Sequence, residues 1–146
     1  MTSGIGPGYF FEDLHVGMEA SLIQTVSGDG VQAFAEISGD LNPIHLDEAY
    51  AKESPFRRRI AHGMLSASYI SAVFGTKLPG PGCIYISQTL NFKAPVHIGD
   101  KVTATVRISS LIEHRKRAIF SCQCSVGEKS VLEGEAVIMV PSRAGK

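Results

Sequence analysis

The sequence predicts an α+β fold in which a long central helix lies against a curved antiparallel sheet. Residues 61–74 are apolar on nearly every side of the helix that they would form, which is typical of a helix inside a domain. Four segments of strand-type composition follow between residues 83 and 140, and short turns separate them. A core helix followed by a meander of strands is expected to fold with the sheet curved around the helix.

The segment before the central helix is expected to contain a strand and a first helix. Residues 18–26 have the composition of a short strand. Apolar side chains then recur at helical spacing from Val31 to Ile37. Ser27 is a suitable N-cap for this helix, and Gly39 is a suitable stop.

The strands after the central helix show the alternation of half-buried strands. In residues 102–108, apolar and polar side chains alternate one by one. Cys122 and Cys124 are two positions apart, so on a strand both side chains would point to the same face. Metal and redox sites usually use a Cys-x-x-Cys spacing, and free Cys is commonly buried. We therefore expect structural cysteines.

Length and composition indicate one domain. The chain has 146 residues, of which 44% are hydrophobic, enough for one compact core and too few for two ordinary domains. We expect a single domain over residues 1–146, with an ordered core at about 9–141 and a disordered polar tail after it.

The charge balance excludes some classes of partner. Lys plus Arg and Asp plus Glu both number 14, so no net charge attracts nucleic acid or a lipid surface. The sequence has no apolar run of about 18 residues for a membrane span, and its first residues lack the features of a secretory signal. A cytoplasmic protein with no nucleic-acid or membrane partner is expected.

Asp40 and His45 place a carboxylate and an imidazole on one short segment. The residue before a proline is pushed out of the helical region, so Asn42-Pro43 predicts a constrained loop over residues 40–45. The two groups could divide the acid and base roles in adding water to an enoyl thioester, each contributing roughly 10²–10⁴-fold. Gly63 opens the central helix, where a free N–H could stabilise the developing oxyanion.

Each of these residues also has an ordinary structural explanation. An Asp such as Asp40 often accepts a hydrogen bond in an Asx turn. His45 could equally be a histidine that is satisfied within the core, and for His62 this structural interpretation is the favoured one. The residues alone leave these alternatives open.

Three segments together resemble the MaoC-like dehydratase family, and within it the single-domain (R)-specific enoyl-CoA hydratases and 3-hydroxyacyl-thioester dehydratases. They are DLNPIHLD at 40–47, IAHGML at 60–65 and LPGPG at 78–82, followed by Gln88, Phe92, Pro95, Gly99 and Asp100. The resemblance implies a hot-dog fold, a long central helix wrapped by a curved antiparallel sheet. It also implies a homodimer whose sheets join and whose active sites lie at the subunit interface.

The resemblance assigns roles to individual residues. Asp40 and His45 would hold and activate the catalytic water, and the Gly63 N–H would bind the oxyanion. Ser71 on the central helix would support the pair, although a helical Ser can instead bond its own backbone. Asn42 would fix the loop. No metal or other cofactor is implied besides the substrate itself, a thioester of coenzyme A or of an acyl carrier protein.

Two further groups are candidates for substrate contacts. Arg57 and Arg58 belong to a three-arginine run that departs from many relatives, and they could bind coenzyme A phosphates or the acidic helix of a carrier protein. The alternative is a charged loop that faces water. Met64 and Leu65 could line an acyl-chain tunnel, or they could be plain core residues.

The expected function is reversible (R)-specific hydration of trans-2-enoyl-CoA in fatty-acid metabolism. The alternative is a 3-hydroxyacyl-[acyl-carrier-protein] dehydratase of fatty-acid synthesis. A thioesterase on the same fold is a rival because one fold hosts many chemistries, but such thioesterases lack the Asp-x-Asn-Pro-x-His motif. A non-catalytic acyl-thioester-binding module would be expected to have lost Asp40 or His45, and both are present.

Overall fold

The computed structural model describes residues 4–144, which form a six-stranded antiparallel sheet and a long helix on one of its faces. The strand order is β1-β4-β5-β6-β2, and the short β3 also pairs with β6. The strands are β1 (Glu19–Thr25), β2 (Ile84–Gln88), β3 (Asn91–Phe92), β4 (Lys101–Ile112), β5 (Arg117–Val126) and β6 (Lys129–Met139).

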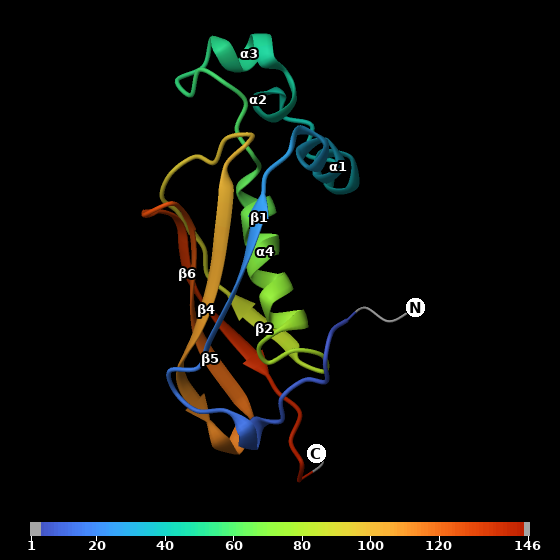
Figure 1. Cartoon of the computed structure of the whole chain (residues 1–146), viewed down its shortest axis with the longest axis vertical. Coiled ribbons are helices and arrows are strands. Elements are labelled where there is room, and N and C mark those ends of the chain that lie inside the picture. The colour runs from blue at the N-terminus through green and yellow to red at the C-terminus, as the bar shows by residue number, and fades with distance from the viewer. Residues whose placement is uncertain (1–3, 145–146) are drawn as a thin grey trace.

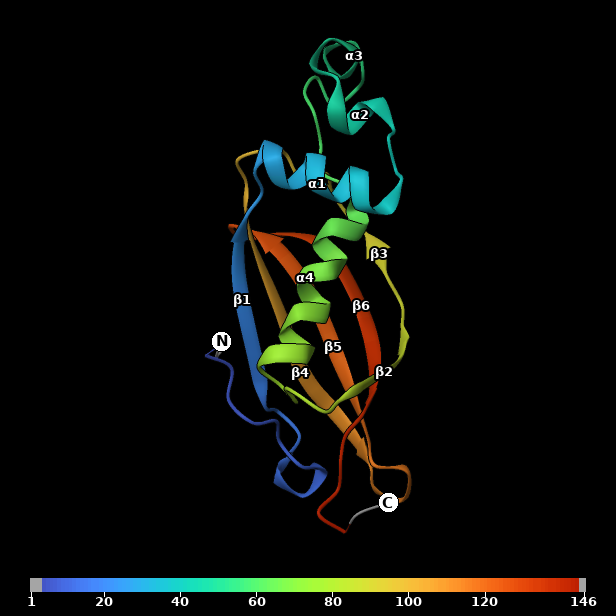
Figure 2. The same ribbon diagram turned by 90° about the vertical axis from the view of Figure 1, so that its right-hand side faces the viewer.

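Helix α4 (Gly63–Thr76) lies along the sheet and the sheet curves around it (Figure 2), so the predicted fold class is confirmed. Ile70, Val73 and Phe74 are buried against the sheet. The Phe74 ring meets Phe120 of β5 edge-on, with the ring centroids 4.8 Å apart. The expectation that α4 is enclosed on every side is wrong for this single chain, because the side that carries Met64 is exposed.

The strand pattern read from the sequence is confirmed. The apolar set of β4, Val102, Ala104, Val106 and Ile108, is fully buried. Cys122 and Cys124 of β5 are both buried, as expected for structural cysteines, and all three cysteines are free thiols. The Cys124 Sγ lies 3.4 Å from the backbone oxygen of Ser66, so it contacts α4 directly.

Three helices gather beyond the N-terminal end of α4 (Figure 1): α1 (Gly28–Ser38), α2 (Pro43–Leu46) and α3 (Glu48–Lys52). The Gly30 N–H donates to the Ser27 hydroxyl over 2.9 Å, and Gly39 ends α1 with a left-handed φ of 82°. Both predicted helix boundaries are therefore confirmed.

The constrained loop expected over residues 40–45 is only partly correct. The chain leaves α1 at Gly39, but α2 begins at Pro43. Proline has no backbone N–H that would be left unpaired at a helix start, and its fixed φ is helical. It is therefore favoured at the first position of a helix. Asn42 caps this helix, since its side-chain oxygen accepts the Ile44 N–H at 3.2 Å.

Both ends of the described chain are tied to each other. Two short 3-10 helices, η1 (Phe11–Asp13) and η2 (Glu113–Arg115), lie outside the sheet. The Ser142 hydroxyl donates to Glu12 over 2.6 Å, and Arg143 pairs with Asp13 over 2.8 Å. The expected disorder of the tail is therefore wrong for Ser142 and Arg143, and its last two positions lie outside the described residues.

Strand β2 leaves one edge of the sheet open and places apolar side chains on it. Ile84, Tyr85 and Ile86 are all exposed. Among residues 4–144, no helix has both the length and the apolar character needed to cross a membrane.

Candidate active site

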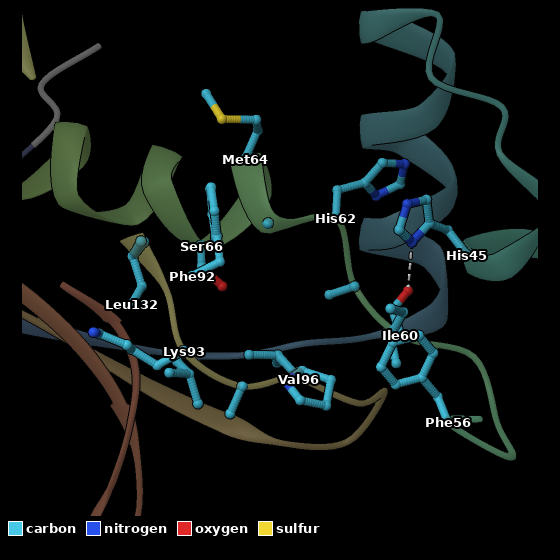
Figure 3. A pocket seen from close by; sticks show the side chains of 15 residues that line it. His45, Phe56, Ile60, His62, Met64, Ser66, Phe92, Lys93, Val96 and Leu132 are labelled. Carbon is cyan, nitrogen blue, oxygen red and sulfur yellow. Dashed lines mark hydrogen bonds between the residues drawn. The ribbon is translucent and has the colours of Figure 1, made fainter. Parts of the chain in front are cut away.

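A cavity of about 530 Å³ opens where the N-terminus of α4 meets α2 and the segment between β3 and β4. Its walls are mainly apolar and include Phe56, Phe92, Val96 and Leu132. Figure 3 shows two imidazole rings side by side at one end of this cavity, those of His45 and His62. The side chains that could move protons therefore border an apolar space.

The main chain fixes the orientation and the tautomer of His45. Its Nδ1 lies 2.8 Å from the Ile60 carbonyl oxygen (Figure 3). A carbonyl can only accept, so Nδ1 carries the proton and the neutral ring has its lone pair on Nε2. The Arg59 Nε–H donates to the His45 backbone oxygen over 2.7 Å, which holds the same residue from the other side.

The surroundings of His45 favour its neutral form. The residue is only 8% exposed. Burial is the largest cause that lowers the pKa of His45, and His62 lowers it further, while the Ile60 carbonyl and Asp40 act in the opposite direction. His45 is therefore able to accept a proton near neutral pH.

Asp40 lies on the loop that joins α1 to α2. Its Oδ1 accepts the Asn42 N–H at 3.3 Å, so the Asx-type bond considered from the sequence is present. A carboxylate has further acceptor sites, and an oxygen of Asp40 lies within 4.8 Å of a ring nitrogen of both His45 and His62. The structural role and a role in proton transfer are therefore compatible.

His62 is a member of the site that the sequence analysis left undecided. It is 2% exposed, and its ring stacks on that of His45 with the centroids 3.8 Å apart. Its Nε2 lies 3.0 Å from the Asp40 backbone oxygen. The sequence signal was the position of His62 immediately before Gly63.

Gly63 is the first residue of α4, and its N–H points out of the helix start. No acceptor for this N–H is found among the part of the chain that the structure describes. A Cβ at this position would lie 2.6 Å from Cε1 of Phe92, so only glycine allows the Phe92 ring to approach this closely. The N–H is therefore a free donor at the edge of the cavity.

Within residues 4–144, Asp40, His45 and His62 form the group that could offer three atoms to a metal ion, because these atoms lie within 4.8 Å of one another. The two imidazole planes are tilted by only 27° and are stacked. Lone pairs of stacked rings run side by side and do not converge on one cation. The arrangement therefore suits proton transfer better than metal binding.

Ser71 is not brought to the pair of Asp40 and His45. It is exposed on α4 and lines a second cavity of about 590 Å³, together with Phe34 and Gln88. Its supporting role stays a prediction. Ser66, which the sequence analysis did not single out, is buried and lines the first cavity instead. Its spacing of three from Gly63 is the signal that could have identified it.

The two candidates for the acyl-chain lining separate in the structure. Met64 is 55% exposed and lines both cavities. Leu65 is half-buried, packs against the hydrophobic core and belongs to neither lining.

The three arginines of the run differ in exposure and contacts. Arg57 and Arg58 are exposed, whereas Arg59 is half-buried and binds the His45 backbone. Arg58 lies midway along the chain between Phe56 and Ile60, and both of these residues line the first cavity. Burial is the main reason that the pKa of His97 is lowered, and the nearby charge of Arg58 lowers it further. Arg58 therefore lies near the rim of the cavity.

The site combines a carboxylate, a neutral imidazole and a free N–H beside an apolar cavity. The first two groups can take and return protons, and the third can stabilise negative charge on a carbonyl oxygen. An α,β-unsaturated or 3-hydroxy thioester is a substrate that would use all three.

Comparisons with known proteins identify relatives over most of the chain. A profile of the MaoC like domain matches residues 14–130. A 3-hydroxybutyryl-CoA dehydratase of Methylorubrum extorquens is 55% identical over 134 residues, which cover 92% of this chain and 85% of that protein. An (R)-specific enoyl-CoA hydratase of Rhodospirillum rubrum is 53% identical over 135 residues, which cover 92% of this chain and 94% of that protein.

Among solved structures, the R-hydratase PhaJ1 from Pseudomonas aeruginosa matches with a TM-score of 0.89 and 40% identity, over 93% of this chain and 88% of that one. The fold is the hot-dog fold, as the sequence resemblance implied. The relatives are named as hydratases and dehydratases, enzymes that add water or remove it. On this evidence the chain belongs to the MaoC-like dehydratase family.

Proposed function

We propose that the protein catalyses the reversible, (R)-specific hydration of trans-2-enoyl-CoA to (R)-3-hydroxyacyl-CoA. The observation that carries the proposal is the neutral His45, whose Nδ1–H is held by the Ile60 carbonyl and whose Nε2 is left free close to the Asp40 carboxylate. The (R) configuration is supported by the names of relatives such as the Rhodospirillum rubrum hydratase.

In the hydration direction, a water molecule would lie between Asp40 and His45. His45 Nε2 takes one proton from the water as its oxygen attacks C3 of the enoyl group, and the Asp40 carboxylate accepts a hydrogen bond from the other hydrogen. The proton then passes from the imidazolium by way of Asp40 to C2, so the two groups share the acid and base roles. Dehydration follows the same steps in reverse, so neither direction needs a redox cofactor or a metal ion.

The Gly63 N–H would bind the thioester oxygen. Attack at C3 moves negative charge onto this oxygen, and a fixed N–H at a helix N-terminus stabilises it without reorganisation. Loss of one such donor costs on the order of 3–4 kcal/mol of transition-state stabilisation in other enzymes. A side-chain substitution cannot remove a backbone donor. The contribution of the Gly63 N–H to transition-state stabilisation depends on where α4 begins.

The observations favour hydration over the rival activities. A non-catalytic module would not need a neutral, oriented His45 beside a carboxylate. A thioesterase on this fold would not be expected to carry the Asp-x-Asn-Pro-x-His motif that supplies Asp40 and His45 here. The two relatives at more than half identity are named for CoA substrates, which favours coenzyme A over an acyl carrier protein as the physiological carrier.

The two cavities suggest how a long substrate would lie. The first holds the reacting thioester, and the exposed Arg57 and Arg58 would contact coenzyme A phosphates near its rim. The second cavity, which is mostly apolar and shares Met64 with the lining of the first, would take the end of the acyl chain. Ser71 would then face the acyl chain.

A homodimer would complete this arrangement. Edge strands with exposed apolar residues are sites of strand pairing, and β2 presents Ile84, Tyr85 and Ile86. A second copy paired at β2 would cover these residues together with the second cavity. Each chain would contribute one domain spanning residues 1–146.

A cytoplasmic location is also part of the proposal. The three cysteines are free thiols, and disulfides are rare in the reducing cytoplasm. Cell fractionation, with a periplasmic marker as the contrast, would check the location directly.

Substitution of either proton-transfer group should abolish most of the activity. With crotonyl-CoA, we expect Asp40→Asn and His45→Gln each to lower kcat by about 10²–10⁴-fold, the usual contribution of a general acid or base. The measurement is loss of enoyl absorbance, followed by chiral analysis for the (R) product. Ile37→Ala, at an 86% exposed position of α1, is the control and should keep full activity. Near-normal turnover in either variant would remove the proposed role of that residue.

The pH dependence should report the lowered pKa of His45. Hydration needs the neutral imidazole, so kcat/KM should be flat at neutral pH and fall below a pKa that is less than the ordinary value of 6.5. The same shift contributes stability that is present above the unfolded value of 6.5 and is lost as the pH falls toward the folded pKa. An acid limb at or above pH 6.5 would contradict this role.

Arg58 should contribute to binding of coenzyme A and not to chemistry. We expect Arg58→Ala to raise KM for crotonyl-CoA about fivefold with little change in kcat, because an exposed ion pair contributes up to about 1 kcal/mol. Added salt should raise KM in the wild type more than in the variant. Arg107→Ala is the control, since Arg107 lies on β4 and pairs with Glu19 over 3.6 Å. Equal salt dependence in wild type and Arg58→Ala would argue that Arg58 only faces water.

The proposed dimer can be tested at the sheet edge. We expect sedimentation equilibrium to give twice the mass of one chain, and Ile86→Lys to shift the protein toward monomer because a charge on an edge strand opposes pairing. The exposed Ile37→Ala on α1 should leave the mass unchanged. A monomeric wild type at micromolar concentration would reject the dimer.

A further inference from the structure

His62 contacts or adjoins each of the three residues that the proposed reaction uses. Its Nε2 lies 3.0 Å from the Asp40 backbone oxygen, across 22 positions of sequence. Its ring stacks on His45, with a centroid distance of 3.8 Å and a plane angle of 27°. It is also the N-cap residue of α4, covalently joined to Gly63.

The hydrogen bond of His62 determines which of its nitrogens is protonated. The Asp40 carbonyl can only accept, so Nε2 carries the proton and donates. Its Nδ1 is buried and has no hydrogen-bond partner among residues 4–144. Leaving a buried polar atom unpaired costs free energy. An apolar side chain would avoid this cost, so packing alone does not explain a histidine at this position.

The position of Asp40 depends on this contact. Asp40 is exposed, and its other hydrogen bonds are local: its N–H donates to the Ser38 hydroxyl over 3.1 Å, and its Oδ1 accepts the Asn42 N–H. No other donor to the Asp40 backbone oxygen is found in the described part of the chain. The His62 bond therefore joins the α1–α2 loop to the start of α4.

We propose that His62 is a positioning residue that holds Asp40, His45 and the Gly63 N–H in one fixed arrangement, through its bond to the Asp40 carbonyl and its stacking on His45. The proposal rests on the proposed hydration. Because neither contact reaches the substrate, His62 should affect the rate of the chemical step and not the binding of the thioester.

Two variants separate the contacts of His62. His62→Phe keeps a ring that can stack on His45 but removes the donor to Asp40. His62→Gln keeps an N–H donor at a similar distance from the backbone but removes the ring. Ile108→Val, a truncation at a fully buried position of β4 far along the chain, is the control for a general loss of stability.

For crotonyl-CoA, we expect His62→Phe to lower kcat on the order of 10²-fold, since misplacement of a catalytic group by about 1 Å has this effect. KM should change less than about threefold. The kcat of His62→Gln should be about tenfold higher than that of His62→Phe. Ile108→Val should retain the wild-type kcat. Equal kcat in His62→Phe and wild type, or equal losses in the Phe and Gln variants, would overturn the proposal.

The pH profile gives a second readout that a purely structural residue would not change. The groups that face His45 are His62 from the start of α4, Asp40 from the α1–α2 loop, the Ile60 carbonyl and the Arg59 guanidinium bound to its backbone. His62 lowers the pKa of His45, although burial is the larger cause. Both variants should therefore move the acid limb of kcat/KM to higher pH, and an unmoved limb would overturn the proposal.

Failure of the His62 proposal can be distinguished from an unfolded variant and from failure of the proposed hydration. If His62→Phe does not fold, the acid limb and kcat of His62→Gln decide the outcome alone. If the wild type does not turn over crotonyl-CoA or longer enoyl-CoA substrates, the proposed hydration fails. NMR titration of the His45 ring in wild type and His62→Gln then still tests the contact, and an unchanged pKa would reject it.

Discussion

The packing of α4 against the curved sheet is the interaction on which the rest of the structure depends. Phe74, near the C-terminal end of α4, meets Phe120 of β5 edge-on, and both side chains are almost completely buried. Truncation of one such side chain usually costs about 3–5 kcal/mol, a large part of the roughly 5–15 kcal/mol that keeps a domain folded. This packing fixes α4 against the sheet, and the Gly63 N–H at the start of the helix is held in place with it.

The same apolar packing sets the chemistry of the site. His45 has its lone pair on Nε2 because its other nitrogen is bound to the Ile60 carbonyl, and it stays neutral mainly because it is buried. A donor at a dry helix N-terminus is also worth more than the same donor in water. One apolar environment therefore favours the neutral His45 ring and strengthens the Gly63 N–H as a donor.

Local rules were sufficient for much of the fold. Ser27 and Gly39 mark the two ends of α1 through hydrogen bonds to residues a few positions away. The buried side of β4 follows from the alternation of apolar and polar side chains. The start of α2 was missed because Asn42-Pro43 can end one helix and also begin the next. The ordered part of the tail was missed because Arg143 reaches Asp13 from the other end of the chain.

The site was predictable only where its residues lie close together in the sequence. Asp40 and His45 share one short segment, and the structure places them together. The partner of His62 is a backbone oxygen 22 positions away, and no side-chain pattern records a backbone contact. The resemblance assigned a role to Ser71, and that role stays a prediction. Ser66 was not singled out because its burial beside the first cavity depends on packing that the sequence does not record.

The bond from His45 to the Ile60 carbonyl has an evolutionary consequence. Every amino acid supplies the same carbonyl, so the tautomer of the His45 imidazole does not depend on which side chain stands at position 60. The backbone there is held independently, since the Ile60 N–H bonds the Ile44 oxygen at 3.3 Å and the Ala61 N–H bonds the Val96 oxygen at 2.7 Å. Mutations at the exposed Arg57 and Arg58 can therefore change the rim of the cavity while the contacts that orient His45 are inherited unchanged.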